Sequence, residues 1–256
     1  QAVSRGTEAA ASKEGIDLTV STSEIDPAKQ LSSFENAVAQ QPSGVILSPL
    51  DEAAMVKPVQ HAVEAGIPVL LLANTLSEDA GQLSYVGSNF AEIGELKAKY
   101  LASKVGEGGT VAMVNGTRGL SFVEDQANVA RKVFEEAGVE VVDDVYTKAI
   151  TPDEGLKATE NIITTHPEVE GIYYSGDESA LGGIKAIQRA GLPKGQIVIV
   201  ATDGSAGAIE AIEEGSMSLT ISQCAFLQGE KAVEIFSEYL GSGKEPGERV
   251  NTPILE

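Results

Sequence analysis

The sequence predicts an α/β protein built on parallel sheets, and two observations support this fold class. Short apolar runs alternate with helical patterns along nearly all of the 256 residues. Within residues 166–215, two apolar runs end close to an Asp, Asp177 and then Asp203, and a helical pattern follows each at once. Strand–turn–helix units at this spacing form parallel sheets with right-handed crossovers. In open parallel sheets, ligands bind at the carboxyl ends of the strands, where both Asp residues are expected.

Local signals define the elements in order. Residues 3–14 have a helical pattern that Gly15 ends, and residues 16–20 alternate as a strand does. Asp26 and Pro27 start the next helix, because Asp caps a helix N-terminus and Pro suits the first helical position. Because the chain begins on a helix, we expect its preceding strand either upstream of this sequence or missing from the first domain. Further helices are expected at 53–65, 90–104, 122–137, 152–165 and 226–240, strands at 45–47, 67–72, 110–114, 139–146, 169–174, 197–201 and 217–222, and an extended segment at 250–255.

The composition excludes several classes of protein. With 38 acidic and 18 basic residues, the net charge is −20, which repels nucleic acids and anionic membranes. The single cysteine, Cys224, excludes an internal disulfide and a multi-cysteine metal site, and two histidines are too few for a histidine-rich one. The longest apolar run, 69–73, is too short to span a membrane. We therefore expect no metal, no cofactor and no bound nucleic acid.

The sequence contains no pattern typical of catalysis. Neither His61 nor His166 falls at a strand end beside a Ser or Asp, and a GxSxG nucleophile elbow is absent. The loop GTRGLS at 116–121 has two glycines but lacks the GK[ST] ending of a phosphate-binding loop. An enzyme is the least favoured hypothesis, and we expect a protein that binds a small molecule without converting it.

Seven segments, in order along the chain, carry a family likeness. They are DPAKQ at 26–30, GVILSPLD at 44–51, AGIPVLLLANT at 65–75, YVGSNFAEIG at 85–94, HPEVEGIYYSGDESALGGIKAI at 166–187, VIVATDG at 198–204 and TISQ at 220–223. In these segments the chain resembles the periplasmic sugar-binding proteins of the ribose- and galactose-binding type. This type I periplasmic binding fold is related to the effector domains of LacI-type repressors.

The resemblance implies two Rossmann-like lobes, each with a parallel sheet flanked by helices, joined by a hinge of three segments. One lobe would comprise residues 1–88 and 224–249, and the other residues 89–223 and 250–256. The ligand would bind in a cleft between the lobes. The family begins with a strand whose following loop reaches this cleft. Residue 1 of this chain corresponds to the helix after that strand, so the resemblance implies that part of the family's site is absent from this sequence.

Asp203 and Gln223 are the first candidates for ligand contact. A carboxylate at position 203 can accept two hydrogen bonds from neighbouring hydroxyls, which is how such families hold sugars. An amide at position 223 supplies a donor and an acceptor together, which suits an alcohol. The alternatives are that Asp203 caps the helix starting near Ser205 and that Gln223 makes a hinge hydrogen bond.

Four further candidates follow from positions where the chain departs from the family pattern. Asn74 follows Ala73 where the family often has Asp-Arg, Gln126 stands where it often has Arg, and Gly176 and Ser48 stand where it often has Asn. A common sugar-stacking aromatic is replaced by Ile150. These departures imply a site that is smaller, less charged and less aromatic than a pentose or hexose site.

Tyr174 and Arg118 complete the set of candidates. Tyr173 and Tyr174 are adjacent in a strand, so at most one can face a pocket, and core packing is the default for both. Arg118, in the loop at 116–121, could reach a ligand from the cleft lip, although a solvated arginine is the common case for a loop.

We expect a solute-binding protein that captures a small neutral sugar, polyol or related hydroxylated compound by hinge closure, for ABC-type uptake. Its partners would be the ligand and a membrane permease or receptor, and we expect a monomer. The protein would be periplasmic or extracellular, with or without a lipid anchor. The alternative is a ligand-sensing domain of a membrane receptor or histidine kinase, or the effector domain of a LacI-type regulator.

Overall fold

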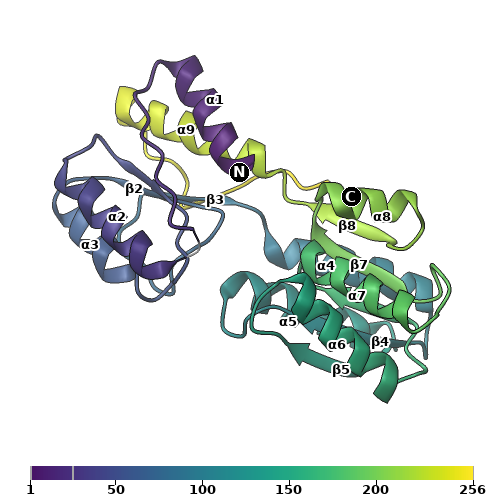
Figure 1. Ribbon diagram of the computed structural model, residues 1–256. Coiled ribbons are helices and arrows are strands. Elements are labelled where there is room, and N and C mark those ends of the chain that lie inside the picture. The colour runs from purple at the N-terminus through teal and green to yellow at the C-terminus, as the bar shows by residue number, and fades with distance from the viewer. Residues whose placement is uncertain (1, 25, 256) are drawn as a thin grey trace. The chain divides into compact units, whose positions relative to one another are not determined.

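The computed structural model describes residues 2–24 and 26–255. The chain divides into two compact units, Gln1–Ser88 with Cys224–Pro253, and Asn89–Gln223 with Ile254–Glu256 (Figure 1). The chain passes from one unit to the other three times. Residues 250–253, which the sequence analysis placed in the second lobe, lie in the first unit. The reason is that Arg249–Asn251 forms a strand paired with Ser84–Gly87 of that unit.

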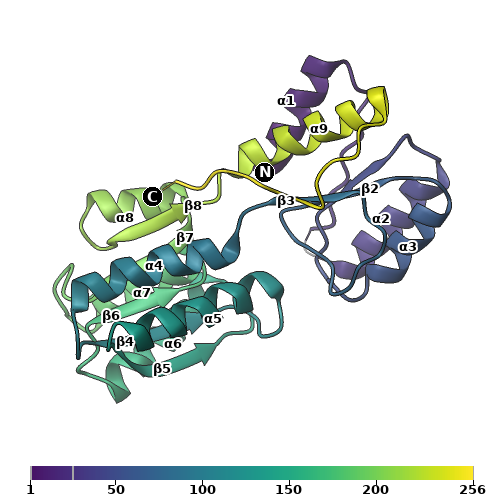
Figure 2. The same cartoon turned by 180° about the vertical axis from the view of Figure 1, so that it is seen from behind.

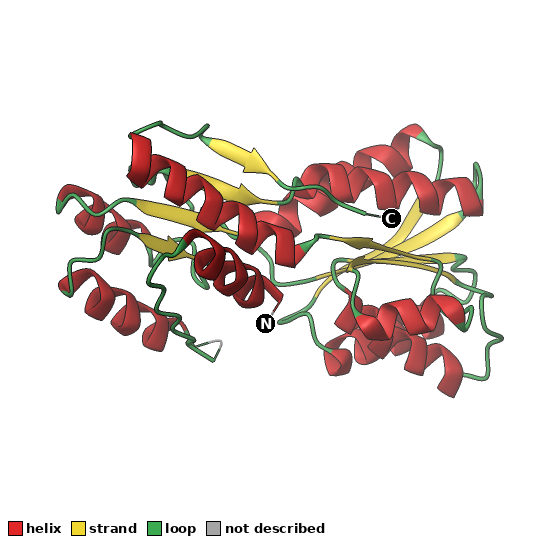
Figure 3. Ribbon diagram, turned by 90° about the horizontal axis from the view of Figure 1, so that it is seen from above, coloured by secondary structure: helices red, strands yellow, loops and turns green. Residues whose placement is uncertain are grey.

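The first unit has one parallel sheet of four strands in the order β1-β2-β3-β9. Helices cover both faces of this sheet, and Figure 3 shows helices and strands in separate colours. Its elements are α1 (Ala2–Glu14), α2 (Pro27–Ala39), β1 (Val45–Leu47), α3 (Val56–Glu64), β2 (Val69–Leu72), β3 (Ser84–Gly87), α9 (Ala225–Ser242) and β9 (Arg249–Asn251).

Alternate residues of β2 point to opposite faces of this sheet. Val69 and Leu71 pack with side chains of α2 and α3. Leu70 and Leu72 pack against α9. All four residues are buried, which explains why the sequence shows an unbroken apolar run here instead of an alternating pattern.

Helices α1 and α9 lie side by side and touch through glycines (Figure 1). A Cβ added at Gly6 would lie 2.0 Å from the backbone oxygen of Phe226, and one added at Gly229 would lie 2.2 Å from that of Val3. Both distances are far below van der Waals contact. The two helix backbones can approach this closely only because neither crossing position carries a side chain.

Residues 16–20 do not form a strand, which corrects the sequence prediction. Ile16, Leu18 and Ile46 of β1 pack against one buried cluster, formed by Ala10, Ala11 and Val233. In the described part of the sheet, however, β1 is hydrogen-bonded to β2 alone. The alternation at 16–20 therefore reflects partial burial, because a strand also needs a neighbour that pairs with its backbone.

The second unit has a parallel sheet of five strands in the order β5-β4-β6-β7-β8. Since the chain runs from β4 to β5 on one side and then to β6 on the other, the strand order reverses at β4, which is where open parallel sheets bind ligands. The elements are α4 (Phe90–Val105), β4 (Thr110–Asn115), α5 (Ser121–Glu136), β5 (Glu140–Tyr146), α6 (Pro152–Thr165), β6 (Gly171–Tyr174), α7 (Asp177–Arg189), β7 (Val198–Asp203), α8 (Ala206–Glu213) and β8 (Leu219–Ser222).

Helices cover both faces of this second sheet. Side chains of α4 and α5 pack on one face and those of α6, α7 and α8 on the other, as Figures 1 and 2 show from opposite sides. Tyr173 belongs to the first face and Tyr174 to the second. The adjacent tyrosines thus point in opposite directions, as the period of a strand requires.

Side-chain caps start several helices of the second unit. The Asn89 side chain accepts a hydrogen bond from the Glu92 amide, and Thr151 caps α6 in the same way. Ser205 caps α8, so Asp203 does not serve as its N-cap. Across residues 2–24 and 26–255, every helix is too short or too polar to cross a membrane.

Candidate ligand-binding site

Polar side chains meet where β7 and β8 of the second unit end. Asp203 is the last residue of β7, and Gln223 directly follows the last residue of β8. Gln223 Nε2 donates a hydrogen bond to Asp203 Oδ1 at 2.7 Å. The two strands are parallel neighbours with Asp203 opposite Ser222. The fold therefore brings together the two candidates that the sequence analysis placed first.

The backbone is strained at several strand ends. The φ angle of Asp203 is 130°, a conformation that non-glycine residues rarely adopt and that costs about 1–3 kcal/mol. Ala73, just after β2, and Cys224, just after Gln223, also have positive φ angles of 63° and 49°. Strain of this kind concentrates at functional sites, because only a requirement for a particular geometry maintains it.

Protein atoms crowd the Asp203 carboxylate, although more than a third of the residue's surface is exposed to solvent. Burial and the negative charge of Asp177 raise the pKa of Asp203 to about 7, against the opposing effects of the Gln223 hydrogen bond and the charge of Lys97. Water contacts the exposed part of Asp203 and weakens the effect of burial. The pKa of Asp203 is therefore raised by less than full burial would raise it. The upward direction is the property that matters for ligand binding.

Gly176 lies against the same group of residues. A Cβ at Gly176 would lie 3.3 Å from Asp203 Oδ2 but only 2.7 Å from Ile150 Cγ2. The isoleucine therefore occupies the space that a side chain at position 176 would need. The two departures from the family pattern, Ile150 and Gly176, are structurally linked: with this isoleucine in place, an asparagine at position 176 does not fit.

Asp177 lies behind this edge and is buried. Its Oδ1 accepts a hydrogen bond from Thr220 Oγ1 at 2.7 Å, and its Oδ2 accepts one from the Ser205 amide at 2.7 Å. Burial raises the pKa of Asp177, while these hydrogen bonds lower it. Asp177 thus ties the start of α7 to β8 and α8, and its negative charge acts on Asp203.

Lys97 of α4 is a residue of this edge that the sequence analysis missed. Its side chain is fully buried, and its Nζ donates hydrogen bonds to Gln126 Oε1 and to the Tyr174 carbonyl oxygen, both at 2.8 Å. Burial lowers the pKa of Lys97 to about 7, while Asp203 and Asp177 act to raise it. A signal was present in the sequence: Lys97 lies four residues after Ile93 and four before Leu101, on the buried stripe of an otherwise ordinary helix.

The structure corrects the prediction for Gln126. The residue is 1% exposed. Its Oε1 accepts hydrogen bonds from Lys97 and from Thr202 Oγ1, and its Nε2 donates to the Phe122 carbonyl oxygen. The amide is therefore engaged inside the unit, where it links α4, α5 and β7, and it does not reach a ligand from the surface.

The structure also corrects the prediction for Tyr174. The side chain is fully buried in the core beneath α6 and α7, and its hydroxyl shares a 2.6 Å hydrogen bond with Thr159 Oγ1. Burial raises the pKa of this tyrosine. Because β6 is covered on both faces, neither Tyr173 nor Tyr174 has a ring free to stack on a sugar.

Arg118 lies at the same edge but away from Asp203. Its guanidinium stacks over the Tyr146 ring at 3.7 Å, and Tyr146 ends the outer strand β5. Three strand spacings separate β5 from β7, which corresponds to about 14 Å. Arg118 is therefore exposed, and its guanidinium stacks on Tyr146. It does not contact the group formed by Asp203, Gln223 and Gly176.

The first unit carries its own pair of candidates. Ser48 follows β1 and Asn74 follows β2 by two residues, and these strands are parallel neighbours. Asn74 Nδ2 donates to the Pro49 carbonyl oxygen at 3.0 Å. Gln30 holds the loop after β1 in place, because its amide bonds both the Ser48 carbonyl oxygen and the Leu50 amide at 2.8 Å. Ser48 and Asn74 thus share the carboxyl edge of their own sheet.

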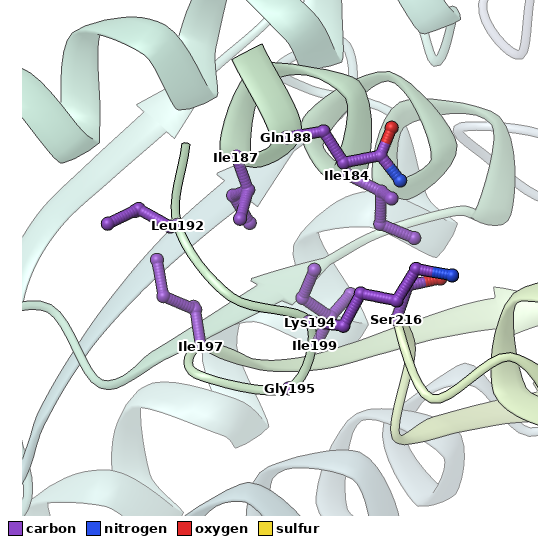
Figure 4. Close-up of a pocket in the computed structure, with 9 residues that line it drawn as sticks. All are labelled: Ile184, Ile187, Gln188, Leu192, Lys194, Gly195, Ile197, Ile199 and Ser216. Atoms are coloured by element: carbon purple, nitrogen blue, oxygen red, sulfur yellow. The ribbon is translucent and has the colours of Figure 1, made fainter. Parts of the chain in front are cut away.

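A small cavity lies at the opposite end of the second sheet. Its volume is about 20 Å³, enough for about one water molecule. Figure 4 shows the side chains that line it, from α7, the start of β7 and the loops before β7 and β8. A sugar does not fit there. The described residues contain no group of three or more His, Cys, Asp or Glu side chains placed to hold a metal ion.

Two parallel sheets, each flanked by helices and each ending in polar groups, define an α/β ligand-binding protein. Residues 1–245 match the family model of the periplasmic binding protein domain. The chain is 30% identical over 244 residues to the ribose import binding protein of Salmonella typhimurium, covering 93% of this chain and 79% of that protein. It is 27% identical over 241 residues to the D-allose-binding periplasmic protein of Escherichia coli, covering 90% and 76% respectively.

Solved structures agree with this match. A periplasmic ribose ABC transporter from Conexibacter woesei is 57% identical, with a TM-score of 0.95 over 99% of this chain and 85% of that chain. A solute-binding protein from Actinobacillus succinogenes with bound D-allose is 29% identical, with a TM-score of 0.90 over 99% and 90%. The chain belongs to the periplasmic binding protein family. The predicted fold class is confirmed, and so is the prediction of a solute-binding protein of ABC-type transport.

Proposed function

We propose that this protein binds a small neutral sugar or polyol, and that Asp203 and Gln223 hold its hydroxyl groups. The observation that carries the proposal is the 2.7 Å hydrogen bond between Gln223 Nε2 and Asp203 Oδ1 at the strained end of β7. The relatives named for ribose and D-allose support a sugar as the ligand.

The chemistry of this pair suits adjacent hydroxyl groups. A carboxylate presents two acceptor oxygens, and an amide presents a donor and an acceptor side by side. Hydrogen bonds to a charged group are worth about 1.5–3 kcal/mol each, more than those between neutral groups. The Gln223 bond orients the carboxylate before the sugar arrives, so less ordering is needed upon binding.

The surroundings favour a small ligand. Ile150, an aliphatic residue, packs against Gly176 beside Asp203. Tyr174 and Gln126 are turned into the protein interior. Beside Asp203, a sugar would be held by hydrogen bonds and by aliphatic contact with Ile150.

Ser48 and Asn74 would add contacts from the first unit if both units contribute to one site, as the sequence analysis expects. Capture by closure of the units on the ligand remains a prediction, and small-angle scattering with and without D-ribose tests it. The proposed partner is a membrane permease of the ABC type. We propose a periplasmic or extracellular location for the protein, with or without a lipid anchor, and a monomeric state.

Calorimetric titration with D-ribose, D-allose, D-xylose, myo-inositol and erythritol tests the proposal. We expect saturable binding of at least one of the sugars. Asp203→Asn should weaken that binding by about ten-fold or more, because it removes a charged acceptor. Asp17→Asn, at an exposed position of the first unit, is the matched control and should bind like the unchanged protein. Wild-type affinity in Asp203→Asn would remove Asp203 from the site, and binding of none of the five compounds would contradict the sugar assignment.

A further inference from the structure

The ammonium group of Lys97 is buried where such a group is costly. Lys97 is fully buried in α4, and its Nζ has two oxygen partners at 2.8 Å, Gln126 Oε1 and the Tyr174 carbonyl oxygen. Its third neighbour is the Tyr173 ring, whose centroid lies 4.0 Å from Nζ. Among the described residues, Lys97 forms none of the direct ion pairs. Burying an ammonium without an adjacent carboxylate destabilises a fold, so a buried lysine in this position needs a functional explanation.

The partners of Lys97 lead directly to the ends of two strands. Gln126 Oε1 also accepts a hydrogen bond from Thr202 Oγ1 at 3.0 Å, and Thr202 immediately precedes Asp203. The Tyr174 carbonyl group ends β6, two residues before Gly176. The lysine thus lies behind the carboxyl ends of β6 and β7, on the protein side of the group that the proposed function assigns to the ligand.

We propose that Lys97 is a positioning residue of the ligand site, whose buried positive charge keeps Asp203 ionised and holds the end of β7 in place. The Tyr173 ring of β6 lies directly beside its ammonium group, and the negative charges of Asp203 from β7 and Asp177 from α7 act on it. Two carboxylates at one edge repel each other, and a single cation behind them offsets that repulsion. The part of the proposal that concerns sugar affinity rests on the proposed function, whereas the part that concerns ionisation does not.

The direction of each pKa agrees with this arrangement. The charge of Asp177 raises the pKa of Asp203, and the charge of Lys97 lowers it. Conversely, both carboxylates raise the pKa of Lys97 against the effect of burial. Without the lysine, Asp203 would be protonated over a wider pH range. A protonated carboxyl group accepts sugar hydroxyls less well than a carboxylate.

The first experiment needs no ligand. The titration of the Asp203 carboxyl carbon is followed by NMR in the unchanged protein, in Lys97→Met and in Lys99→Met. Lys99 lies two residues further along α4 but is exposed and paired with Glu95, so it is the matched control. We expect the Asp203 midpoint to move to higher pH in Lys97→Met and to stay in place in Lys99→Met. An unmoved midpoint in a folded Lys97→Met overturns the proposal.

A reciprocal experiment covers the case in which Lys97→Met does not fold. Asp203→Asn changes an exposed residue, and coupling between two titrating groups acts equally in both directions. The Lys97 side-chain titration should therefore move to lower pH in Asp203→Asn. If it keeps its wild-type midpoint, the two groups are not coupled and the proposal fails.

The final experiment adds D-ribose as the probe. At pH 7, Lys97→Met should bind it about ten-fold more weakly than the unchanged protein, and the loss should shrink as pH rises, because Asp203 ionises in both proteins. A purely structural defect would weaken binding equally at every pH, and that result would contradict the positioning role. If the unchanged protein binds no D-ribose, the proposed ligand is wrong, while the two titration experiments still decide the role of Lys97.

Discussion

Replacing Lys97 by methionine should stabilise the protein, even though it should weaken ligand binding. Burial lowers the pKa of Lys97 from its ordinary 10.5 to about 7. At about 1.4 kcal/mol per pH unit, this difference corresponds to about 5 kcal/mol of unfavourable burial for the charged form. The side chain is fully buried by its surface area as well, so solvent does not reduce this value.

Part of the stability gained by removing the buried charge is lost again in Lys97→Met. Methionine leaves Gln126 Oε1 and the Tyr174 carbonyl oxygen each without one donor, which costs about 1–3 kcal/mol. Its side chain is one atom shorter, and the small void costs about 1 kcal/mol. The expected net effect at pH 7 is a rise of about 1–3 kcal/mol in the free energy of unfolding, which is several degrees in Tm for a chain of this size.

The pH dependence distinguishes this explanation from a change in packing. A lysine with a lowered folded-state pKa binds fewer protons in the folded protein than in the unfolded one, so its burial costs most at and below about pH 7. The cost disappears as pH rises to 10.5, where the unfolded chain also releases the proton. The advantage of Lys97→Met should therefore decline steadily between these two values.

Urea unfolding at pH 6.5, 8 and 9.5 measures this difference. Lys99→Met, which removes an exposed lysine of the same helix, should change stability by less than about 0.5 kcal/mol at each pH. A Lys97→Met variant less stable than the unchanged protein at pH 6.5 would refute the burial argument. So would an advantage of equal size at all three pH values.

Three further predictions follow from single contacts. Gly182→Ala should lower the free energy of unfolding by about 2–4 kcal/mol in urea, because the new Cβ would lie 1.9 Å from a backbone oxygen of α6. Gly241→Ala in α9 is the control. Its new Cβ meets open space, so it should be neutral or slightly stabilising. Tyr174→Phe should cost about 1 kcal/mol by loss of its buried hydrogen bond and leave sugar affinity unchanged in calorimetry, so weakened binding would restore Tyr174 to the site. Sugar affinity should fall as pH drops through the raised pKa of Asp203, where the carboxylate takes up a proton, and Asp203→Asn should remove this dependence; a flat profile for the unchanged protein would contradict the role of the carboxylate.

The strand-end positions were predictable because they depend on local sequence. An apolar run followed by a polar residue and a helical pattern fixes where a buried strand stops, and parallel strands stop at the same edge. Asp203 and Gln223 could be placed together on this basis, and they share a hydrogen bond in the structure. The strand predicted at 16–20 was wrong, because alternation indicates only that a segment is half-buried. Whether a neighbouring strand pairs with that segment is decided by the tertiary structure.

The orientation of individual side chains was less predictable. Tyr173 and Tyr174 were known to face opposite sides of their strand, but both sides are covered by helices, so neither faces a ligand. Gln126 lies on α5, on the side that faces the sheet. Only the packing of α4 against α5 shows that its amide oxygen accepts a hydrogen bond from Lys97. Interactions between residues 29 positions apart are not encoded in any local pattern.

The family resemblance indicated the class of protein. The sequence by itself determined the alternating order of strands and helices, and the strand ends that carry Asp203, Gln223, Ser48 and Asn74. These features depend on hydrophobic periodicity, capping and chain direction, all of which act over a few residues. The tertiary structure decided which candidates are buried and hydrogen-bonded inside the second unit. It also placed a buried lysine behind the sheet edge that carries Asp203 and Asp177. The physical reason is that burial and electrostatic coupling depend on neighbours brought from distant parts of the chain, and these neighbours exist only once the sheet and its helices have packed.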